Sequence, residues 1–370
     1  MYLFSKKEEC CGCGACADIC PVGAICMEQD EEGFSYPRIK EEVCIDCGRC
    51  REICPVRNMG QTLQQRRMYI GAQAKEEELR YGSSSGGVFP ILAKYIFDRQ
   101  GKVYGAAYNE AMEVVHRSAD SMAQLDGLRR TKYVQSRMDG IYREIEEQLK
   151  ENRWILFCGT PCQAHALRLY LNRDYSRLVI VDLICYGVPS PGIWNSYVRY
   201  LERKHKGRMK EFSFRDKRNR DNGHIRSYKV GDIEYTATLY EDIFCRMYFK
   251  NYILRQSCTK CKFCTTERST DFTIGDFWGI EQIREDMDDG MGTSVVILHT
   301  DKAKEIWDNV KEKTHWFICE EEEILQPRLK TPTDMAERRS KIMNLYRVLP
   351  FPAFLNLADW MMKLWKCLNI

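Results

Sequence analysis

Residues 10–21 read CCGCGACADICP, and residues 44–55 read CIDCGRCREICP. Both stretches carry the spacing Cys-x-x-Cys-x-x-Cys-x-x-x-Cys-Pro, and they align without a gap. This agreement indicates an internal repeat, so two copies of one small unit are expected. The proline after each fourth cysteine ends the loop because its ring cannot continue a helix.

The spacing is that of bacterial ferredoxins with two [4Fe–4S] clusters, in which the fourth cysteine of each run binds the other cluster. It predicts one ligand set of Cys10, Cys13, Cys16 and Cys54, and a second set of Cys44, Cys47, Cys50 and Cys20. A disulfide or zinc framework is the alternative. Cys11 is out of register with Cys44, and Cys26 follows the proline, so neither is expected to be a ligand.

Length and charge limit the possible classes of protein. The 370 residues leave room for one large domain or two medium ones beside the ferredoxin unit. Lys and Arg outnumber Asp and Glu by only 56 to 53, so no basic field favours nucleic acid as a partner. No apolar run reaches the ~18 residues of a membrane span. Residues 1–9 contain no apolar signal region, and we expect a cytoplasmic, reducing setting.

Apolar runs and helical patterns divide the rest of the chain. We expect a ferredoxin domain over residues 1–60, a polar linker over 61–68, a large domain over 69–330 and a helical tail over 331–370. Within the large domain, predicted strands (residues 102–108, 154–158, 178–185, 271–275 and 294–299) alternate with predicted helices (residues 138–151, 162–171 and 193–204). This alternation predicts an α/β domain with a mainly parallel sheet. Residues 212–239 have the pattern of a hairpin insertion.

A second cysteine group, Cys258-x-x-Cys261-x-x-Cys264, lacks the fourth cysteine of a ferredoxin run. Cys162 and Cys185 are candidates for the missing ligands because they follow predicted parallel strands, at whose carboxyl ends sites gather. We expect a third [4Fe–4S] cluster here, with a zinc site or inert thiols as alternatives. By spacing alone, Cys264 competes with Cys162. The remaining thiols are expected to be buried and inert, namely Cys158, Cys245, Cys319 and Cys367.

The small residues from Ser83 to Gly87 precede an apolar helix that is expected to start near Val88 or Phe89, since Pro90 is tolerated only in a first helical turn. Their backbone N–H groups and the helix N-terminus could hold an anion such as a phosphate. A flexible turn with Ser85 as the helix cap explains the same residues.

Seven motifs occur together and in one order: residues 83–87 (SSSGG), 105–107 (GAA), 132–136 (KYVQS), 159–163 (GTPCQ), 185–191 (CYGVPSP), 258–261 (CTKC) and 275–279 (GDFWG). In this order they resemble the coenzyme F420 hydrogenase/dehydrogenase beta-subunit family. The resemblance spans about residues 70–285. It implies an FAD-binding α/β domain with a [4Fe–4S] cluster near the flavin, bound by Cys162, Cys185, Cys258 and Cys261.

The same resemblance supplies the predicted cofactor residues, which are Ser83, Ser84, Ser85, Gly86, Gly87, Lys132, Tyr133, Gln135, Ser136, Gly159, Thr160 and Asp276. Two positions depart from the family pattern. Tyr186 stands where the family commonly has His, and Gly223-His224 stands where it has Gly-Trp. The resemblance therefore implies the cofactors and leaves the substrate, including a deazaflavin, unassigned.

Several other residues have two explanations each. Residues 215–220, with Arg226, could hold a substrate anion or form a solvated hairpin. His116 and His165 are candidate proton donors, and packing is the alternative for both. In the tail, Trp360, Met361, Leu364, Trp365 and Leu368 share one helical face, which could dock on the core or bind a partner or a membrane surface.

Together these features predict a ferredoxin-linked, flavin-dependent oxidoreductase that moves electrons between a ferredoxin-like carrier and an organic hydride acceptor or donor. In this interpretation the cofactors carry the chemistry and the protein sets spacing and access. The alternative is a non-catalytic electron-transfer subunit of a larger hydrogenase or dehydrogenase complex. A partner subunit or a homo-oligomer is compatible with either hypothesis.

Overall fold

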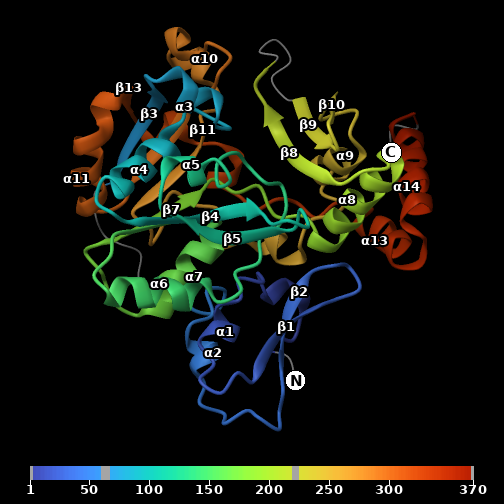
Figure 1. Cartoon of the computed structure of the whole chain (residues 1–370). Coiled ribbons are helices and arrows are strands. Elements are labelled where there is room, and N and C mark those ends of the chain that lie inside the picture. Colours follow the sequence, from blue (N-terminus) through green and yellow to red (C-terminus); the bar gives the residue numbers. More distant parts are fainter. Residues whose placement is uncertain (1–2, 60–66, 219–224, 368–370) are drawn as a thin grey trace.

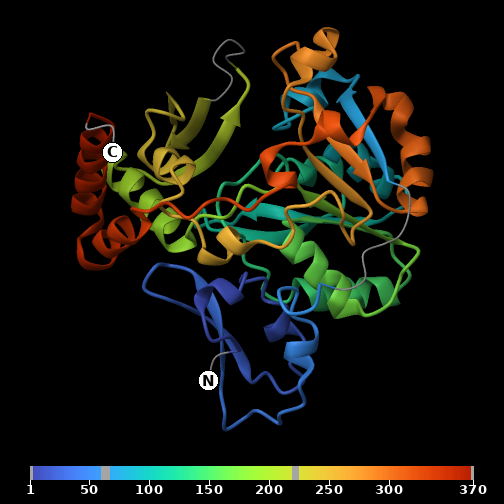
Figure 2. The ribbon, with the colours of Figure 1, turned by 180° about the vertical axis from the view of Figure 1, so that it is seen from behind.

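The computed structural model describes residues 3–59, 67–218 and 225–367, with side chains up to residue 365. The chain forms a large lobe built on a sheet, a smaller lobe beside it, and an N-terminal module that packs beneath both (Figures 1 and 2). The two C-terminal helices lie on the outer side of the smaller lobe. Both lobes therefore rest on the module that carries the two cysteine runs.

The N-terminal module shows that the sequence repeat is also a structural repeat. Its elements are η1 (Lys7–Glu9), α1 (Ala15–Asp18), β1 (Ile25–Gln29), β2 (Ser35–Ile39) and α2 (Arg49–Glu52). Strands β1 and β2 pair antiparallel. The short helices α1 and α2 stand at equivalent places in the two cysteine runs, contact each other, and follow the matching residues Gly14 and Gly48.

The large lobe contains an eight-stranded sheet in the order β13-β3-β12-β11-β7-β6-β4-β5. The strands are β3 (Met68–Ala74), β4 (Lys102–Tyr108), β5 (Val114–Ala119), β6 (Ile155–Gly159), β7 (Leu178–Leu183), β11 (Phe272–Asp276), β12 (Ser294–Leu298) and β13 (Thr314–Cys319). The four central strands β11, β7, β6 and β4 pair parallel. Counting β3, five strands run in one direction, and β5, β12 and β13 run in the other.

Helices cover both faces of this sheet. They are α3 (Glu77–Tyr81), α4 (Val88–Phe97), α5 (Met122–Leu125), α6 (Ile141–Lys150), α7 (Pro161–Leu171), α10 (Ile280–Ile283), α11 (Asp301–Val310) and α12 (Glu321–Ile324). Side chains alternate between faces along a strand. In β7, Val179 and Val181 belong to the core with α4 and α11, while Leu178 and Ile180 belong to the core with α6 and α7. The second core also includes residues of the module.

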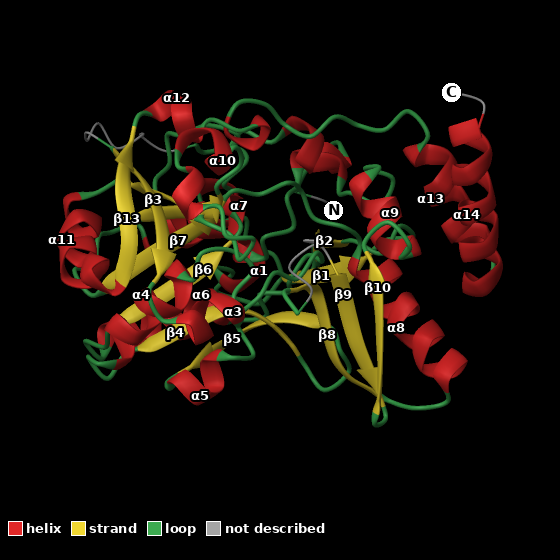
Figure 3. Ribbon diagram, turned by 90° about the horizontal axis from the view of Figure 1, so that it is seen from above, coloured by secondary structure: helices red, strands yellow, loops and turns green. Residues whose placement is uncertain are grey.

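The smaller lobe is a three-stranded antiparallel sheet with helices packed around it (Figure 3). It consists of β8 (Met209–Asp216), β9 (Ile225–Val230), β10 (Ile233–Thr238), α8 (Pro191–His205), α9 (Ile243–Phe249), α13 (Arg339–Val348) and α14 (Phe351–Cys367). Fully buried Trp194 lies at the centre of its core, which Phe34 and Tyr36 of the module complete.

The α/β class and the predominance of one strand direction are confirmed. Helix α4 starts at Val88, as Pro90 predicts. The sequence did not reveal the antiparallel strands β5, β12 and β13 as such, because their residues have the same apolar, β-rich character as parallel ones. Residues 212–239 fall in a three-stranded sheet where a hairpin was expected.

The module packs against the large lobe through Ala15, Ile19 and Ile53. The linker was expected over residues 61–68. Residues 61–66 lie outside the described residues, and Met68 already begins β3. The tail is docked: α14 buries Phe354, Leu355, Ala358 and Met362. On the predicted apolar face Trp360 is 59% exposed, and Leu368 lies outside the described residues. Among the helices described, none is long and apolar enough to cross a membrane.

Candidate iron-sulfur and cofactor sites

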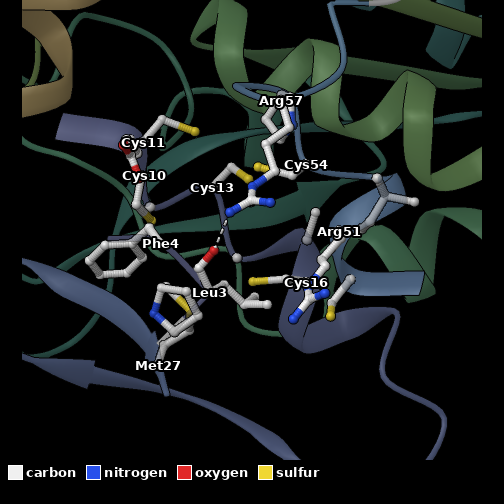
Figure 4. Close-up of a pocket in the computed structure, with 18 residues that line it drawn as sticks. Leu3, Phe4, Cys10, Cys11, Cys13, Cys16, Met27, Arg51, Cys54 and Arg57 are labelled. Carbon is white, nitrogen blue, oxygen red and sulfur yellow. Dashed lines mark hydrogen bonds between the residues drawn. The ribbon is translucent and has the colours of Figure 1, made fainter. Parts of the chain in front are cut away.

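The predicted first ligand set lines a single cavity in the N-terminal module, which we call the module cavity. Cys10, Cys13, Cys16 and Cys54 all lie on its wall, together with Cys11 (Figure 4). Cys50 lines the same cavity. Arg57 also lines the cavity, and its guanidinium donates to the Leu3 carbonyl over 2.8 Å. The two cysteine runs therefore contribute to one cavity, as the exchange of the fourth ligand requires.

The predicted second ligand set lies at the outer side of the module. Cys44 and Cys47 are exposed, while Cys20 and Cys50 are half-buried. Cys50 is within electrostatic reach of both exposed thiols. The Cys20 sulfur accepts a hydrogen bond of 3.2 Å from the Ala24 N–H. This set is the part of the cysteine framework that is most open to solvent.

The four cysteines of the family motifs line another cavity, which we call the junction cavity. They are Cys162, Cys185, Cys258 and Cys261, and Cys264 and Cys11 lie on the same wall. Cys162 stands in the first turn of α7 and Cys185 follows β7, so both lie at the carboxyl ends of neighbouring parallel strands. Cys258 is carried by the short turn η3 (Gln256–Lys260). Cys185 is within electrostatic reach of the other three.

Cys11 connects the two cavities, and the sequence did not indicate this. The thiols of Cys13 and Cys162 both lie close to its own, so it stands between the module cavity and the junction cavity. The only available signal was its place beside Cys10 in the ligand run. Of the thiols expected to be inert, Cys245 and Cys319 are buried, Cys158 lines the large cavity described next, and the side chain of Cys367 lies outside the described residues.

The large cavity has a volume of about 390 Å³ and lies at the carboxyl ends of the central strands. That volume suits a small-molecule cofactor. Ten of the twelve predicted cofactor residues line it: Ser83, Ser84, Ser85, Gly87, Lys132, Tyr133, Ser136, Gly159, Thr160 and Asp276. Gly86 and Gln135 do not. The structure thus gathers motifs from separate chain segments into one cavity.

The loop of residues 83–87 is held from outside the cavity. The half-buried Lys217 ammonium donates to three backbone carbonyls, those of Arg80, Ser85 and Met291, at 2.9, 2.7 and 2.6 Å. Burial lowers the pKa of Lys217 to about 7. A Cβ on Gly86 would lie 2.3 Å from the Ala72 carbonyl oxygen, so packing against β3 accounts for this glycine.

The charged side chains on the wall of the large cavity are mostly cationic. Arg129, Arg130, Lys132, Arg215 and Arg328 line it, and among the lining residues described, Asp276 is the sole carboxylate. Asp276 pairs with Arg215. The N-terminus of the ten-residue helix α4 opens on the same cavity. This combination favours an anionic ligand, such as one that carries phosphates.

The two histidine candidates have different positions. His116 is buried on the wall of the large cavity, and its ring nitrogens contact the Ser136 hydroxyl at 2.8 Å and the Cys158 carbonyl at 3.1 Å. Burial lowers the pKa of His116 to about 4, so it is neutral near pH 7. His165 is not on that wall. Its nitrogens contact Ser269 at 2.6 Å and the Asn58 carbonyl at 2.8 Å, which attaches the end of the module to α7.

The charged segment at the end of β8 contributes only in part to the cavity. Arg215 lines it, and Arg218 pairs with Glu234 on the exposed side. Arg226 pairs at 2.6 Å with buried Asp242 inside the smaller lobe. Asn219, Arg220, Gly223 and His224 lie outside the described residues.

The three cavities adjoin one another. Cys11 lies on the walls of the module and junction cavities, and Thr160 and residues 185–188 lie on the walls of the junction and large cavities. Within the described part of the chain, no three Cys, His or carboxylate groups converge on a point where one metal ion would bind. A zinc site needs such convergence, with Zn–S near 2.3 Å.

Comparisons with known proteins agree with this geometry. Residues 9–58 match the family described as 4Fe-4S dicluster domain. Residues 152–323 match the family described as the C terminus of the beta subunit of coenzyme F420 hydrogenase/dehydrogenase. The F subunit of the F420H2 dehydrogenase of Methanosarcina mazei is 29% identical over 196 residues, which are 49% of this chain and 54% of the relative. The chain thus matches about half the length of that relative.

Among solved structures, a chain of the F420-reducing [NiFe] hydrogenase complex from Methanosarcina barkeri aligns with 16% identity and a TM-score of 0.45, over 82% of this chain and 93% of that chain. The matches correct one prediction. The chain was expected to be a flavin-dependent oxidoreductase in its own right, and this is wrong, because the family and the relative are named as subunits of hydrogenases and dehydrogenases. The chain is thus similar to the beta subunits of coenzyme F420 hydrogenase/dehydrogenase over residues 152–323 and to 4Fe-4S dicluster domains over residues 9–58.

Proposed function

We propose that this chain is an iron-sulfur electron-transfer subunit of a hydrogenase- or dehydrogenase-type complex. The observation that carries the proposal is the continuity of the three cavities through Cys11 and through Thr160 and Cys185. Sites that share wall residues are close enough for their cofactors to exchange electrons. When bound, the clusters supply one-electron transfer at potentials that the surrounding protein sets.

The junction cavity is the proposed site of a third [4Fe–4S] cluster. Cys162, Cys185, Cys258 and Cys261 would hold it, since these four match the family motifs and line one wall. Cys264 is the competing ligand because it shares that wall. Strands β6 and β7 fix the first two thiols, while the turn η3 and the residue after it present the others.

The large cavity is the proposed site of FAD. Its cationic wall, together with the α4 N-terminus and the serines of residues 83–85, would hold the phosphates. Aromatic side chains, among them Tyr133, Tyr186 and Phe249, offer surfaces for a planar ring system. His116 is hydrogen-bonded at both nitrogens, so orienting the wall suits it better than donating a proton.

The outer side of the module is the proposed contact with a redox partner. The exposed thiols of Cys44 and Cys47 would put the second cluster at the surface, where a ferredoxin-like carrier or a partner subunit can approach. The organic compound that exchanges hydride within the complex stays unassigned, because Tyr186 departs from the family pattern.

The order of the sites can be tested with two electron donors. We expect Cys47→Ser to slow reduction of the remaining clusters by reduced ferredoxin, because the outer entry is lost. A small viologen should still reduce them at nearly the wild-type rate, because it does not depend on a protein docking site. Rapid-mixing absorbance on anaerobic protein measures both rates. Equal ferredoxin rates in the variant and the wild type would contradict the proposed order.

The subunit role has its own test. The purified chain alone, with full cluster content, should turn over small organic acceptors negligibly, and activity should require a second subunit. Steady turnover of an organic acceptor by the chain alone would contradict the proposal.

A further inference from the structure

Arg255 lies fully buried between the module and the lobes. Its backbone belongs to the junction site: its N–H donates to the Val188 carbonyl over 2.9 Å, and its carbonyl accepts from the Cys258 N–H over 3.1 Å. Cys258 is a proposed ligand, and Val188 lies on the junction wall. Arg255 is therefore anchored in the loop that presents the third cluster's cysteines.

The side chain of Arg255 reaches the module instead. Its Nε donates to the Cys10 carbonyl over 2.8 Å, and Nη2 donates to the Ser35 carbonyl over 3.0 Å. Nη2 also lies 3.8 Å from the Cys10 sulfur, within hydrogen-bonding range for sulfur. The guanidinium stacks over the Tyr36 ring at 4.2 Å. One residue thus spans from the junction loop to a ligand of the module cavity.

Two neighbouring residues, Gln135 and Gly12, lie in close contact with this guanidinium. Gln135 accepts from Nη1 over 2.9 Å and donates in turn to the Cys11 carbonyl over 2.7 Å. Gly12 has a positive φ of 67°, and a Cβ there would lie 2.6 Å from Nη1 of Arg255. Within the sequence Cys10-Cys11-Gly12-Cys13, Gly12 therefore leaves room for the buried guanidinium, and the cysteines keep the spacing of cluster ligands.

The charge of Arg255 has no carboxylate partner among the described residues. Arg339 is the matched contrast at the same junction. It pairs with Glu32 of the module at 2.6 Å, and its Nε donates to the Leu254 carbonyl, one residue before Arg255. A buried charge without an opposite charge is costly. The nearest groups that can carry negative charge beside Arg255 include the thiols of Cys10, Cys11 and Cys258.

We propose that Arg255 is the charge-compensating residue of the electron path, with its guanidinium raising the reduction potential of the cluster that Cys10 binds. A cube with four thiolates is anionic, and hydrogen bonds and nearby positive charge make its reduction easier. Arg255 also holds the module loop against the junction loop, so it fixes the spacing of the two sites. The inference rests on the proposed ligand sets and adds a residue that the cysteine motifs do not contain.

The test is a redox titration followed by electron paramagnetic resonance, on the full chain purified anaerobically. Arg255→Gln should shift one cluster potential to a more negative value at full iron content. Arg255→Lys keeps the charge and should shift it less. The double variant Arg339→Gln with Glu32→Gln, which removes a buried ion pair without changing the net charge, should leave all cluster potentials unchanged. Unchanged potentials in an Arg255→Gln protein with full iron would overturn the proposal.

A second variant covers the case in which the Arg255 variants fail to assemble. Gln135→Glu places a carboxylate beside Nη1 with almost no change in shape, and it should also lower the potential. Loss of iron in Arg255→Gln but not in Arg255→Lys would support a need for the charge. Loss of iron in both Arg255 variants, together with wild-type cluster potentials in an iron-replete Gln135→Glu protein, would overturn the proposal. The iron content of the wild type tests the third cluster separately, since the Cys10 cluster belongs to the dicluster domain.

Discussion

The module and the junction site hold thiols of the same kind, but they are built in different ways. The eight predicted ligands of the module lie between residues 10 and 54, in two runs whose spacing defines the sites. The junction thiols extend from residue 162 to residue 261 and come from the start of α7, the end of β7 and the turn η3. They meet only because β6 and β7 are parallel neighbours. One site is encoded by local spacing, and the other by topology.

The two sites also differ in their relation to the rest of the molecule. Cys44 and Cys47 of the module are exposed, whereas the junction cysteines are half-buried between the module and the large cavity. A cluster at the surface can exchange electrons with another protein, and one between two cavities can pass them inward. Substitutions at one site should therefore leave the cluster content of the other site unchanged.

The largest effect is expected when ligands are removed from the junction site alone. Cys258→Ser with Cys261→Ser should cost about a third of the iron, because one cube of four irons is lost and two remain. Iron and acid-labile sulfide per chain measure this. Cys26→Ser, which removes a module thiol outside the ligand set, is the control and should keep all the iron. Full iron in the double variant would mean that the junction cysteines bind no cluster.

A finer comparison separates two cysteines on the same wall. Cys162→Ser should lose most of the junction cluster, because Cys162 is set by α7 and lies within reach of Cys258 and Cys261. Cys264→Ser should keep most of it. Iron content after identical anaerobic reconstitution compares the two. If Cys264→Ser is the more damaging change, Cys264 replaces Cys162 in the ligand set.

The attachment of the module depends on the buried pair of Arg339 and Glu32. Arg339→Met should lower the free energy of unfolding by about 3–5 kcal/mol, because a buried carboxylate is left without its partner. Denaturant titration of the full chain measures the loss. The double variant Glu32→Gln with Arg339→Met should recover part of it. A loss below about 1 kcal/mol would place this pair with ordinary surface ion pairs.

The smallest expected effect is the pH dependence of ligand affinity in the large cavity. Burial lowers the pKa of Lys132 to about 7, so in the folded protein it loses its proton well below the value of about 10.4 for a free lysine. The unfolded chain then binds more protons between these values, so Lys132 makes the free protein more stable as the pH rises through that window. In the free protein, burial favours the neutral form of Lys132. An anionic ligand favours the charged ammonium instead.

FAD affinity should therefore be level below about pH 7 and weaken above it, by up to about tenfold per pH unit, since one proton is taken up on binding. Fluorescence titration of flavin-free protein between about pH 6 and about pH 9 measures this across the Lys132 transition. Lys132→Met should remove the slope, whereas Lys94→Met, on the exposed side of α4, should keep it. A slope that survives in Lys132→Met would assign the proton uptake to another group.

The sequence predicts best where structure depends on neighbouring residues. The cysteine runs, the central strands and the start of α4 at Val88 follow from local spacing and apolar runs. Ten of the predicted cofactor residues share a cavity because the motifs stand at the ends of strands whose order an α/β sheet restricts.

Features that arise between the module and the lobes were not predictable in this way. Cys11 meets Cys162, and Arg255 meets Cys10, only after the module docks. The polar residues 61–68 gave no sign of how the module packs, and Ala15, Ile19 and Ile53 are part of the core with α6 and α7. Gly86 has the pattern of a phosphate loop, yet its close neighbour is the Ala72 carbonyl on β3. Such contacts depend on tertiary packing, which a single sequence does not display.

The central claim is that a cluster in the junction cavity connects the dicluster domain with the large cavity. The most direct test is the iron content of the wild-type chain, purified anaerobically and reconstituted to saturation, with each cube counted as four irons. The claim predicts about 12 irons per chain, from three such cubes. A content that saturates at about 8, the number for the dicluster domain alone, would contradict it.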